Sequence, residues 1–288
     1  TDLYPTDIAF LLDDMPEEYR PVCFRLLPKD IAADVFVELE SDSQEMLIKS
    51  FSNTELESIL DELYLDDTVD IIEEMPSNVV KRILKYSDPD TRKEINKILQ
   101  YPEDSAGSIM TTEFIKLRQS NTVEQAFDII RKNGDEAETI NVCYVTDEGC
   151  HLQGYVTIRT LVLEKDTSTK IADIMDTQII SVSTRDDKED VAQDMSKYDF
   201  DAMPVVDSEN RIVGIVTFDD AMDVMEEEAT EDIEKMAAIT PMDKPYLRTS
   251  TFELWKARIP WLLLLMISAT FTGMIITSFE DALASYVA

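Results

Sequence analysis

The feature that most restricts the fold is an uncharged apolar run from Ile259 to Phe279, near the end of the 288-residue chain. A run of this length can cross the hydrocarbon core of a bilayer as a helix. Trp255 and Trp261 stand at its leading edge, where interfacial aromatic residues are common. The alternative is a buried helix of a soluble protein, but the length of the run and its lack of charge favour a transmembrane helix over 259–279.

The charges on either side of this run indicate its orientation. Lys244, Arg248, Lys256 and Arg258 precede it, whereas Glu280 and Asp281 follow it. Basic residues collect on the cytoplasmic side of membrane helices. We therefore expect residues 1–258 to be cytoplasmic and the chain to lie in the inner or plasma membrane of the cell.

The part before the apolar run carries a large excess of acid. The chain has 60 Asp and Glu against 26 Lys and Arg, a net charge of −34, and all but two of the acids precede the run. Such a field disfavours nucleic acid and anionic lipid as partners of the soluble part, and it attracts cations. A solubilised surface is the ordinary explanation, but self-repulsion of this size opposes a compact state.

Residues 1–103 are expected to be all helical, because apolar residues recur there every 24 positions. The four columns are Leu11, Val35, Ile59 and Ile83; Leu12, Phe36, Leu60 and Leu84; Cys23, Leu47, Ile71 and Ile95; and Leu27, Phe51, Met75 and Leu99. A fixed period of this length indicates stacked helical hairpins that form a superhelix. A plain helical bundle with coincidental spacing is the alternative.

From residue 104 the pattern changes to short strands that alternate with helices, in two similar units at 104–168 and 169–240. The expected elements are a helix near 122–132 and strands at 142–145 and 154–157 in the first unit, then a helix near 188–197 and strands at 203–206 and 214–217 in the second. Each unit is small for a core of its own, so we expect the two to pack as a pair.

The second unit ends in a helix with an unusual charge pattern. Nine of the sixteen residues from Asp219 to Glu234 are acidic and none is basic. Asp220, Asp223, Glu227, Glu231 and Glu234 share one helical face, whereas Met222, Met225, Ala229, Ile233 and Met236 share another. Like charges at this spacing each destabilise a helix by about 0.2–0.5 kcal/mol. We expect the helix to pack through its apolar face.

A second acidic group, Asp66-Asp67-Thr68-Val69-Asp70, lies in the helical domain. Carboxylates about 6 Å apart repel by roughly 3 kcal/mol at an effective dielectric constant near 20. Inverting a 1:99 equilibrium takes about 5.5 kcal/mol. Two unneutralised pairs could hold the domains apart and two bridging cations could close them. Solvated helix faces are the other explanation of both acidic groups.

The side chains available limit which cation could bind. The Asp/Asn ladder with a central Gly that forms an EF-hand loop for Ca²⁺ is absent, and scattered carboxylates completed by water suit Mg²⁺. The only histidine, His151, stands beside Cys150 in an expected hairpin, and we interpret it as structural. The residues by themselves leave Ca²⁺ and Mn²⁺ open.

The order of these parts resembles that of a known family. The segments Asp199–Asp207 (DFDAMPVVD) and Arg211–Asp220 (RIVGIVTFDD) are similar to the core signature of CBS domains, the cystathionine-β-synthase-type regulatory module. The segments Ala229–Glu234 (ATEDIE) and Leu254–Trp261 (LWKARIPW) are similar to the MgtE family of magnesium channels. The resemblance covers the whole chain.

This resemblance implies a multidomain fold: an all-α helical-repeat superhelix (1–103), an α/β tandem CBS pair (104–168 and 169–240), a connecting helix (241–258) and a transmembrane helix (259–279). It implies a homodimer through the CBS domains. The family's pore needs further helices, so the resemblance also implies that the chain is part of a longer protein and does not conduct by itself.

The resemblance implies regulatory Mg²⁺ ligands at matching positions of the sequence. These are Asp34, Asp66 and Asp70 in the helical domain, Asp199, Asp220 and Asp223 in the CBS pair, and Glu228, Glu231 and Asp232 near the helices that lead to the pore. In the family, Mg²⁺ at such sites closes the pore when cytosolic Mg²⁺ is high. The sequence is therefore expected to be a cytosolic Mg²⁺ sensor that gates a magnesium channel.

CBS pairs often bind adenine nucleotides, with a Thr-x-x-Asp motif that holds the ribose. The second unit has this motif as Thr217-x-x-Asp220, with Phe200 placed to contact the base, whereas the first has Thr157-x-x-Thr160 without the acid. We expect a site for ATP or another adenine nucleotide only in the second unit, where it would share Asp220 with Mg²⁺.

Two other functions fit parts of the sequence. A membrane-tethered CBS adaptor would sense adenine nucleotides and bind a partner protein through its acidic helices. The other is a CBS-bearing anion channel, but the acidic helical repeat argues against it, because the acids would repel the permeant anion. No Walker loop, G-x-S-x-G elbow or HExxH pair is present, so we predict that the chain is not an enzyme.

Overall fold

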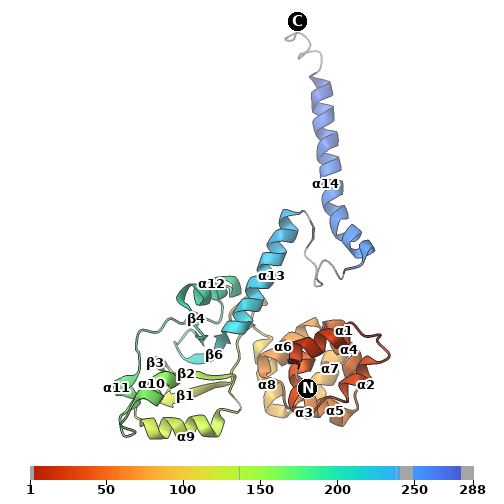
Figure 1. Ribbon diagram of the computed structural model, residues 1–288. Helices are drawn as coiled ribbons and strands as arrows, with labels where there is room; N and C mark the ends of the chain where they lie inside the picture. The colour runs from red at the N-terminus through yellow and green to blue at the C-terminus, as the bar shows by residue number, and fades with distance from the viewer. Residues whose placement is uncertain (1–2, 136, 238, 241–248, 280–288) are drawn as a thin grey trace. The chain divides into compact units, whose positions relative to one another are not determined.

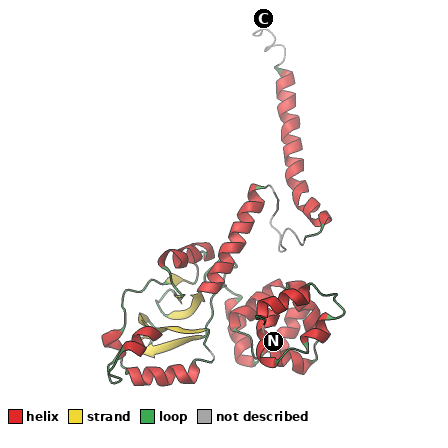
Figure 2. Ribbon diagram, in the orientation of Figure 1, coloured by secondary structure: helices red, strands yellow, loops and turns green. Residues whose placement is uncertain are grey.

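The computed structural model describes residues 3–135, 137–237, 239–240 and 249–279 (Figure 1). The chain divides into two compact bodies, one up to Ala221 and one from Met222 onward, and each is described by itself. The first body holds the helical domain and both CBS units (Figure 2).

Short helices build the helical domain and, apart from that of the second helix, their starts repeat every 24 residues. They are α1 (Pro5–Asp13), α2 (Arg20–Phe24), α3 (Lys29–Val37), α4 (Ser41–Ser50), α5 (Asn53–Leu60), α6 (Leu65–Glu74), α7 (Ser77–Tyr86) and α8 (Pro89–Ile98). Helices α1, α3, α5 and α7 stack in sequence, as do α2, α4, α6 and α8. The predicted repeat is therefore confirmed as a helical stack.

The predicted apolar columns form the core of this stack. Val35, Leu47, Ile83 and Ile95 are all fully buried, in one cluster that also contains the phenylalanines at 24, 36 and 51. The first repeat differs, since Leu11 is 48% exposed. Within the described chain no helix precedes α1 to cover it, whereas the equivalent residue of later repeats is covered by the repeat before.

The two CBS units have the same topology. The first contains β1 (Phe114–Arg118), α9 (Val123–Asn133), β2 (Thr139–Thr146), β3 (Leu152–Thr157) and α10 (Ile158–Leu163). The second contains α11 (Ile171–Ile174), β4 (Val182–Ser183), α12 (Lys188–Tyr198), β5 (Ala202–Val206), β6 (Ile212–Thr217) and the start of α13 (Phe218–Met236). In each sheet the first strand runs parallel to the second and the second antiparallel to the third. All six elements expected from the sequence are present.

Local signals explain where these elements begin and turn. Thr122 and Gln125 form both hydrogen bonds of a capping box at the start of α9. The two hairpins turn in the same way, because the Oδ1 atom of Asp147, and equally of Asp207, accepts two backbone N–H groups of its own turn. Cys150 and Asn210 occupy the same position of the two turns with φ of 65° and 60°.

The segment before the first strand of each CBS unit pairs with the third strand of the other unit. Thr111, ahead of β1, exchanges two backbone hydrogen bonds of 2.9 Å with Ile215 of β6, and Asp176, ahead of β4, exchanges two of 2.9 Å with Tyr155 of β3. A Cβ atom on Gly154 would collide with the carbonyl oxygen of Asp176, which explains a glycine at this crossing. The predicted packing of the two units as a pair is confirmed.

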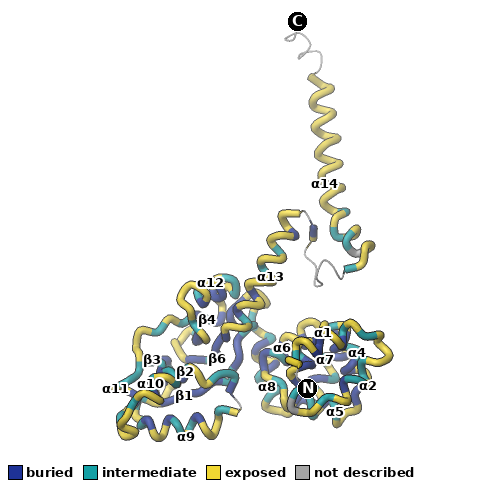
Figure 3. Tube along the Cα trace, viewed as in Figure 1, coloured by how far each residue is buried: buried dark blue, intermediate teal, exposed yellow. Residues whose placement is uncertain are grey.

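The second body contains most of α13 and the helix α14 (Thr251–Ser278). Leu254–Ser278 is long and apolar enough to cross a membrane, with a mean hydropathy of 2.0, and none of it is buried (Figure 3). The boundary predicted at 258/259 lies inside this continuous helix. Residues 241–248 of the expected connecting helix lie outside the described residues.

The methionine stripe through which α13 is expected to pack is exposed in the single chain. Met222, Met225, Ile233 and Met236 are exposed, and Met236 is 82% exposed. The buried apolar residues are instead Ala221 and Val224. The helical periodicity alone does not define which side of the helix is covered.

Candidate metal centre

The first turn of helix α6 presents acids at the edge of the helical domain. Leu65, Val69 and Ile72 are buried and fix this helix in the domain core. Asp66 lies in the first turn and is also buried, with its Oδ1 atom 3.1 Å from the backbone N–H of Asp67, which donates to it. Asp70 follows one turn later and is exposed.

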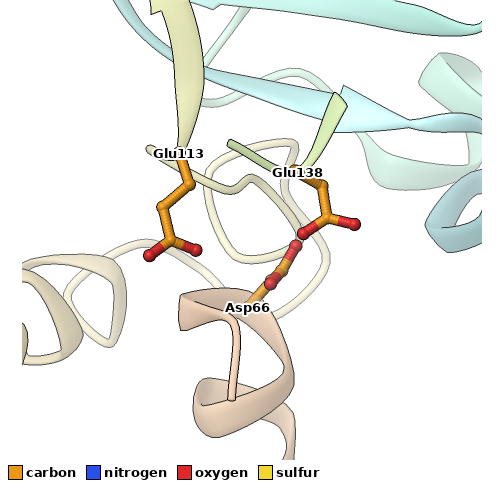
Figure 4. A group of neighbouring side chains, drawn as sticks. All are labelled: Asp66, Glu113 and Glu138. Carbon is orange, nitrogen blue, oxygen red and sulfur yellow. The ribbon is translucent and has the colours of Figure 1, made fainter. Parts of the chain in front are cut away.

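Two glutamates of the first CBS unit face this turn. Glu113 directly precedes β1 and Glu138 directly precedes β2, and the parallel pairing of these strands places the two residues side by side. The N–H of Glu138 donates to the carbonyl oxygen of Glu113 at 2.8 Å. Carboxylate oxygens of Asp66, Glu113 and Glu138 lie within 4.8 Å of one another, with Glu138 turned toward Asp66 (Figure 4).

A cavity of about 200 Å³ connects these acids with the start of α13. Its walls are formed by Ala33, Asp34, Val37, Glu38, Glu62, Leu63, Tyr64, Asp66, Asp67, Glu138, Asp219 and Asp220. The hydroxyl of Thr217 donates to Oδ2 of Asp220 at 2.6 Å, and this contact fixes the carboxylate at the cavity wall. The cavity is thus acidic on all the elements that form it.

The crowding of these acids raises their pKa values. Burial, followed by the charges of Asp220 and Asp219, raises the pKa of Asp67 to about 7. Burial, followed by Asp66, raises the pKa of Glu138 to about 8. Asp66 and Asp220 both have raised pKa values, again through burial first and then through a neighbouring carboxylate.

The carboxylate of Asp70 interacts with the charges of the same acidic cluster, although its side chain is exposed. Desolvation by the surrounding protein, followed by the charge of Asp220, raises its pKa to about 8. Raised values of this kind mean that the cluster resists holding all its charges at once, and a bound divalent cation would reverse that tendency.

The donor set fits Mg²⁺. Every candidate ligand is a carboxylate oxygen, and the cavity has room for water molecules that complete an octahedral shell. The described residues near it include no Cys or His among the cavity walls, so the soft ligands that favour zinc are missing from the site.

The structure brings together part of the predicted ligand set. Asp34, Asp66 and Asp220 line the cavity, and Asp70 lies close enough to Asp220 for the charge of one to affect the other. Asp199 lies elsewhere, exposed at the end of α12 with φ of 54°. Asp223, Glu228, Glu231 and Asp232 lie on α13 in the second body, where Glu231 pairs with Lys235 at 2.6 Å.

Sequence reasoning missed Glu113 and Glu138. A signal was present, because each is the acid immediately before a strand of the same β-α-β unit, and the starts of parallel neighbouring strands meet at one edge. The sequence did not show that this edge faces α6.

A second cavity, of about 530 Å³, lies beside β3 and α10 of the first CBS unit, where residues 174–178 of the second unit pass. Its walls are formed by Tyr155, Val156, Thr157, Thr160, Ile174, Met175, Asp176, Thr177 and Gln178. The Thr157 and Thr160 hydroxyls are 3.0 Å apart. The residues predicted to bind nucleotide in the second unit are placed differently: Thr217 is buried and Phe200 stacks on Tyr198, with ring centroids 5.6 Å apart.

The comparisons with known proteins agree with this organisation. The MgtE intracellular N domain profile matches residues 3–104, and the CBS domain profile matches 106–165 and 171–227. The magnesium transporter MgtE of Thermus thermophilus is 38% identical over the whole chain, and that of Bacillus subtilis is 35% identical. The chain spans 64% and 63% of the lengths of these two relatives.

Two solved structures share the fold. The cytosolic domain of the Mg²⁺ channel MgtE in complex with ATP is 39% identical, with a TM-score of 0.73, and the match covers 77% of this chain and 91% of that one. The soluble part of a magnesium transporter is 34% identical, also with a TM-score of 0.73, and the match covers 79% and 89%.

Proposed function

Because the chain belongs to the MgtE family of magnesium transporters, we propose that it is the Mg²⁺-sensing and gating region of a magnesium channel, with one membrane helix attached. The observation that carries this proposal is the acidic cavity, which takes its walls from the helical domain, the first CBS unit and the start of α13. A cation held there would tie the three together.

The proposed sensing step is the neutralisation of facing carboxylates. Asp66 and Glu138 supply ligand oxygens, Asp220 and Asp34 add negative charge at the wall, and water completes the shell, as Mg²⁺ prefers. Without the ion these acids repel one another, as their raised pKa values indicate. A few kilocalories per mole of repulsion are enough to shift a two-state equilibrium from docked to separated.

Helix α13 provides the proposed route to the membrane helix. It is continuous from Phe218 to Met236, and Asp219 and Asp220 stand in its first turn at the cavity wall. Docking of the helical domain would hold this first turn in one place and, through a rigid helix, restrict the segment that leads to α14. We further propose that Asp223, Glu228, Glu231 and Asp232 hold additional ions along α13, and that Asp199 contributes from the end of α12.

We propose a homodimer through the CBS units and α13. Val162 and Leu163 on α10 and Met222 and Met225 on α13 are large apolar side chains that are exposed in the single chain. Helices α10 and α13 follow equivalent strands of the two CBS units, so both units present apolar residues on the same type of helix.

The test is hydrogen exchange of the 288-residue chain in detergent, measured over α6 during a Mg²⁺ titration. NaCl at matched ionic strength controls for screening. Asp66→Asn should raise the Mg²⁺ midpoint at least about tenfold, because a charge-assisted ligand contact is lost. Asp90→Asn is the matched control, since Asp90 holds the same position of α8 one repeat later and is exposed.

The sensor proposal would be contradicted if NaCl slowed the hydrogen exchange of α6 as much as Mg²⁺ does. The acids would then be a solvated surface. Equal effects of Asp66→Asn and Asp90→Asn would show that general charge, and not a site, controls docking.

The cavity of the first CBS unit supports adenine-nucleotide binding as a second candidate function. The related cytosolic domain was solved with ATP, and this cavity is large enough for a nucleoside. Calorimetry with ATP should give binding that Thr157→Val weakens, because the valine lacks the hydroxyl. Binding that instead depends on Thr217 or Phe200 would place the nucleotide in the second unit.

A further inference from the structure

Helix α6 begins without a cap from its own neighbouring residues. Its N-cap residue, Tyr64, makes no side-chain capping hydrogen bond, whereas Ser52 and Asp88 cap α5 and α8. The first N–H of α6, that of Leu65, instead donates to Oε2 of Glu113 at 3.1 Å. Leu65 is buried, so water has little access to replace this acceptor. The cap of a helical-domain helix is thus supplied by the first CBS unit.

Glu113 is held firmly in the CBS pair. Its N–H donates to Oγ1 of Thr111 at 3.3 Å, and its carbonyl oxygen accepts the N–H of Glu138 at 2.8 Å. Thr111 is in turn joined to Ile215 of β6 by two backbone hydrogen bonds. The position of the Glu113 carboxylate therefore depends on both CBS units.

We propose that Glu113 is a positioning residue that docks α6 on the CBS pair without a cation, so that Mg²⁺ strengthens a contact whose register is already set. This inference rests on the proposed sensor function. It assigns Glu113 a role distinct from that of Asp66 and Glu138, which supply ligand oxygens to the ion.

The physical basis is a hydrogen bond to a helix N-terminus. The first N–H groups of a helix have no acceptor within the helix, and the Glu113 side chain accepts one of them. The facing carboxylates of Asp66, Glu113 and Glu138 repel one another and oppose docking, whereas the hydrogen bond from Leu65 to Glu113 favours it. Docking without Mg²⁺ is the balance of the two, and loss of the cap shifts this balance toward separation.

The experiment uses the 288-residue chain in detergent micelles, with hydrogen exchange of α6 followed first in EDTA and then during a Mg²⁺ titration. Glu113→Ala removes the acceptor, so exchange of α6 in EDTA should become about fivefold faster and the Mg²⁺ midpoint should rise by a similar factor. Glu113→Gln keeps an oxygen that can accept the same hydrogen bond, so its exchange in EDTA should stay close to that of the parent chain. Glu124→Ala, in the exposed first turn of α9, is the matched control.

Either of two outcomes overturns the proposal. One is a Glu113→Ala chain whose α6 exchanges in EDTA as the parent chain does. The other is equal acceleration in EDTA by the Ala and Gln variants, which would make the charge and not the hydrogen bond responsible. If the Ala variant fails to fold, judged by lost protection of α8 and β2, Glu113→Leu keeps the bulk without an acceptor and takes its place.

The EDTA measurement and the Mg²⁺ titration test this proposal and the sensor function separately. A parent chain whose α6 ignores Mg²⁺ overturns the sensor, whereas the EDTA arm tests the Glu113 contact in the absence of any cation. A parent chain that responds to Mg²⁺ while all Glu113 variants match it in EDTA overturns only the positioning role.

Discussion

The two CBS units have the same strand order, the same hairpin turns and the same exchange of a preceding segment, but they differ in the Thr-x-x-X segment after the third strand. The first has Thr157 and Thr160, whose hydroxyls lie 3.0 Å apart beside an open cavity. The second has Thr217 and Asp220, and the acid lines the cavity that α6 shares. The helices that follow also differ, since α10 has 6 residues and α13 has 19.

This difference shows how one scaffold supports two kinds of site. The backbone brings residue four of the Thr-x-x-X segment to a cavity wall in both units. A hydroxyl there adds no charge to the wall, which suits a polyol group, whereas a carboxylate adds charge to an acidic cavity, which suits a cation. The side chain, and not the fold, assigns the chemistry.

The largest expected effect tests whether the exchanged segments are equally tight in the two units. Gly154→Ala should lower the free energy of unfolding by about 3 kcal/mol, because its Cβ meets a fixed carbonyl oxygen. Gly214→Ala should cost less, about 2 kcal/mol, because its new Cβ lies 2.8 Å from the carbonyl oxygen of Thr111, compared with 2.3 Å for Gly154 and Asp176, and its other close neighbour is the side chain of Met110. Urea denaturation measures the free energy of unfolding of both variants. Equal losses of this free energy would mean that the two exchanged segments pack equally closely against their strands.

The next effect concerns the position that distinguishes the units. Asp220→Asn should raise the Mg²⁺ midpoint for α6 protection about thirtyfold, or about 2 kcal/mol, because a charged group of the cavity is lost. Thr160→Asp places the same acid in the first unit and should leave this midpoint unchanged. Hydrogen exchange measures both midpoints, and a shift caused by Thr160→Asp would remove the distinction drawn between the two cavities.

These differences also mark the limit of what the sequence predicts. Helix and strand positions followed from local signals, such as the capping box at Thr122 and the turns at Asp147 and Asp207, and these signals act over a few residues. The 24-residue repeat predicted the helical stack because each repeat needs its neighbour to bury its apolar face.

The site was predicted only in part, because its ligands meet through tertiary packing. Asp66 and Asp220 stood out as members of acidic groups, whereas Glu113 and Glu138 are single acids whose importance depends on what faces the edge of their sheet. The methionine stripe of α13 had the right spacing for a packed helix, yet it is exposed, since spacing does not say that a partner is present in the same chain.

A smaller effect is expected from pH, and it too should depend on the second unit. Asp67, Asp70 and Glu138 have pKa values raised to about 7 or 8 from usual values near 4. The folded state therefore binds more protons than the unfolded chain within this window, and its stability should fall as pH rises from about 5 to 8 in EDTA. We expect a loss of about 1 kcal/mol after allowance for solvent screening.

Thermal unfolding at several pH values measures this loss. Saturating Mg²⁺ should flatten the profile, because the ion holds the acids charged, and Asp220→Asn should reduce the slope in EDTA. A profile that rises with pH in EDTA would contradict the assignment of raised pKa values to these acids.

The smallest effect compares the two hairpins. Cys150 and Asn210 have the same left-handed backbone conformation, which asparagine tolerates better than cysteine does. Cys150→Asn should raise the free energy of unfolding by about 0.5 kcal/mol, and Asn210→Cys should lower it by a similar amount. Chemical denaturation measures both, and a loss of stability in Cys150→Asn would mean that the thiol makes a contact that outweighs the backbone preference.

The exchange of segments between the CBS units has a consequence for how the protein is made. Thr111 leaves the ribosome long before Ile215, and its segment has no hydrogen-bonding partner in the second unit until β6 has been made. Domains commonly fold as units, from the N-terminus, during synthesis. The helical domain can therefore form early, but the CBS pair has to wait for β6, and the nascent chain must stay free of other partners until translation has reached the helix that leads to the membrane.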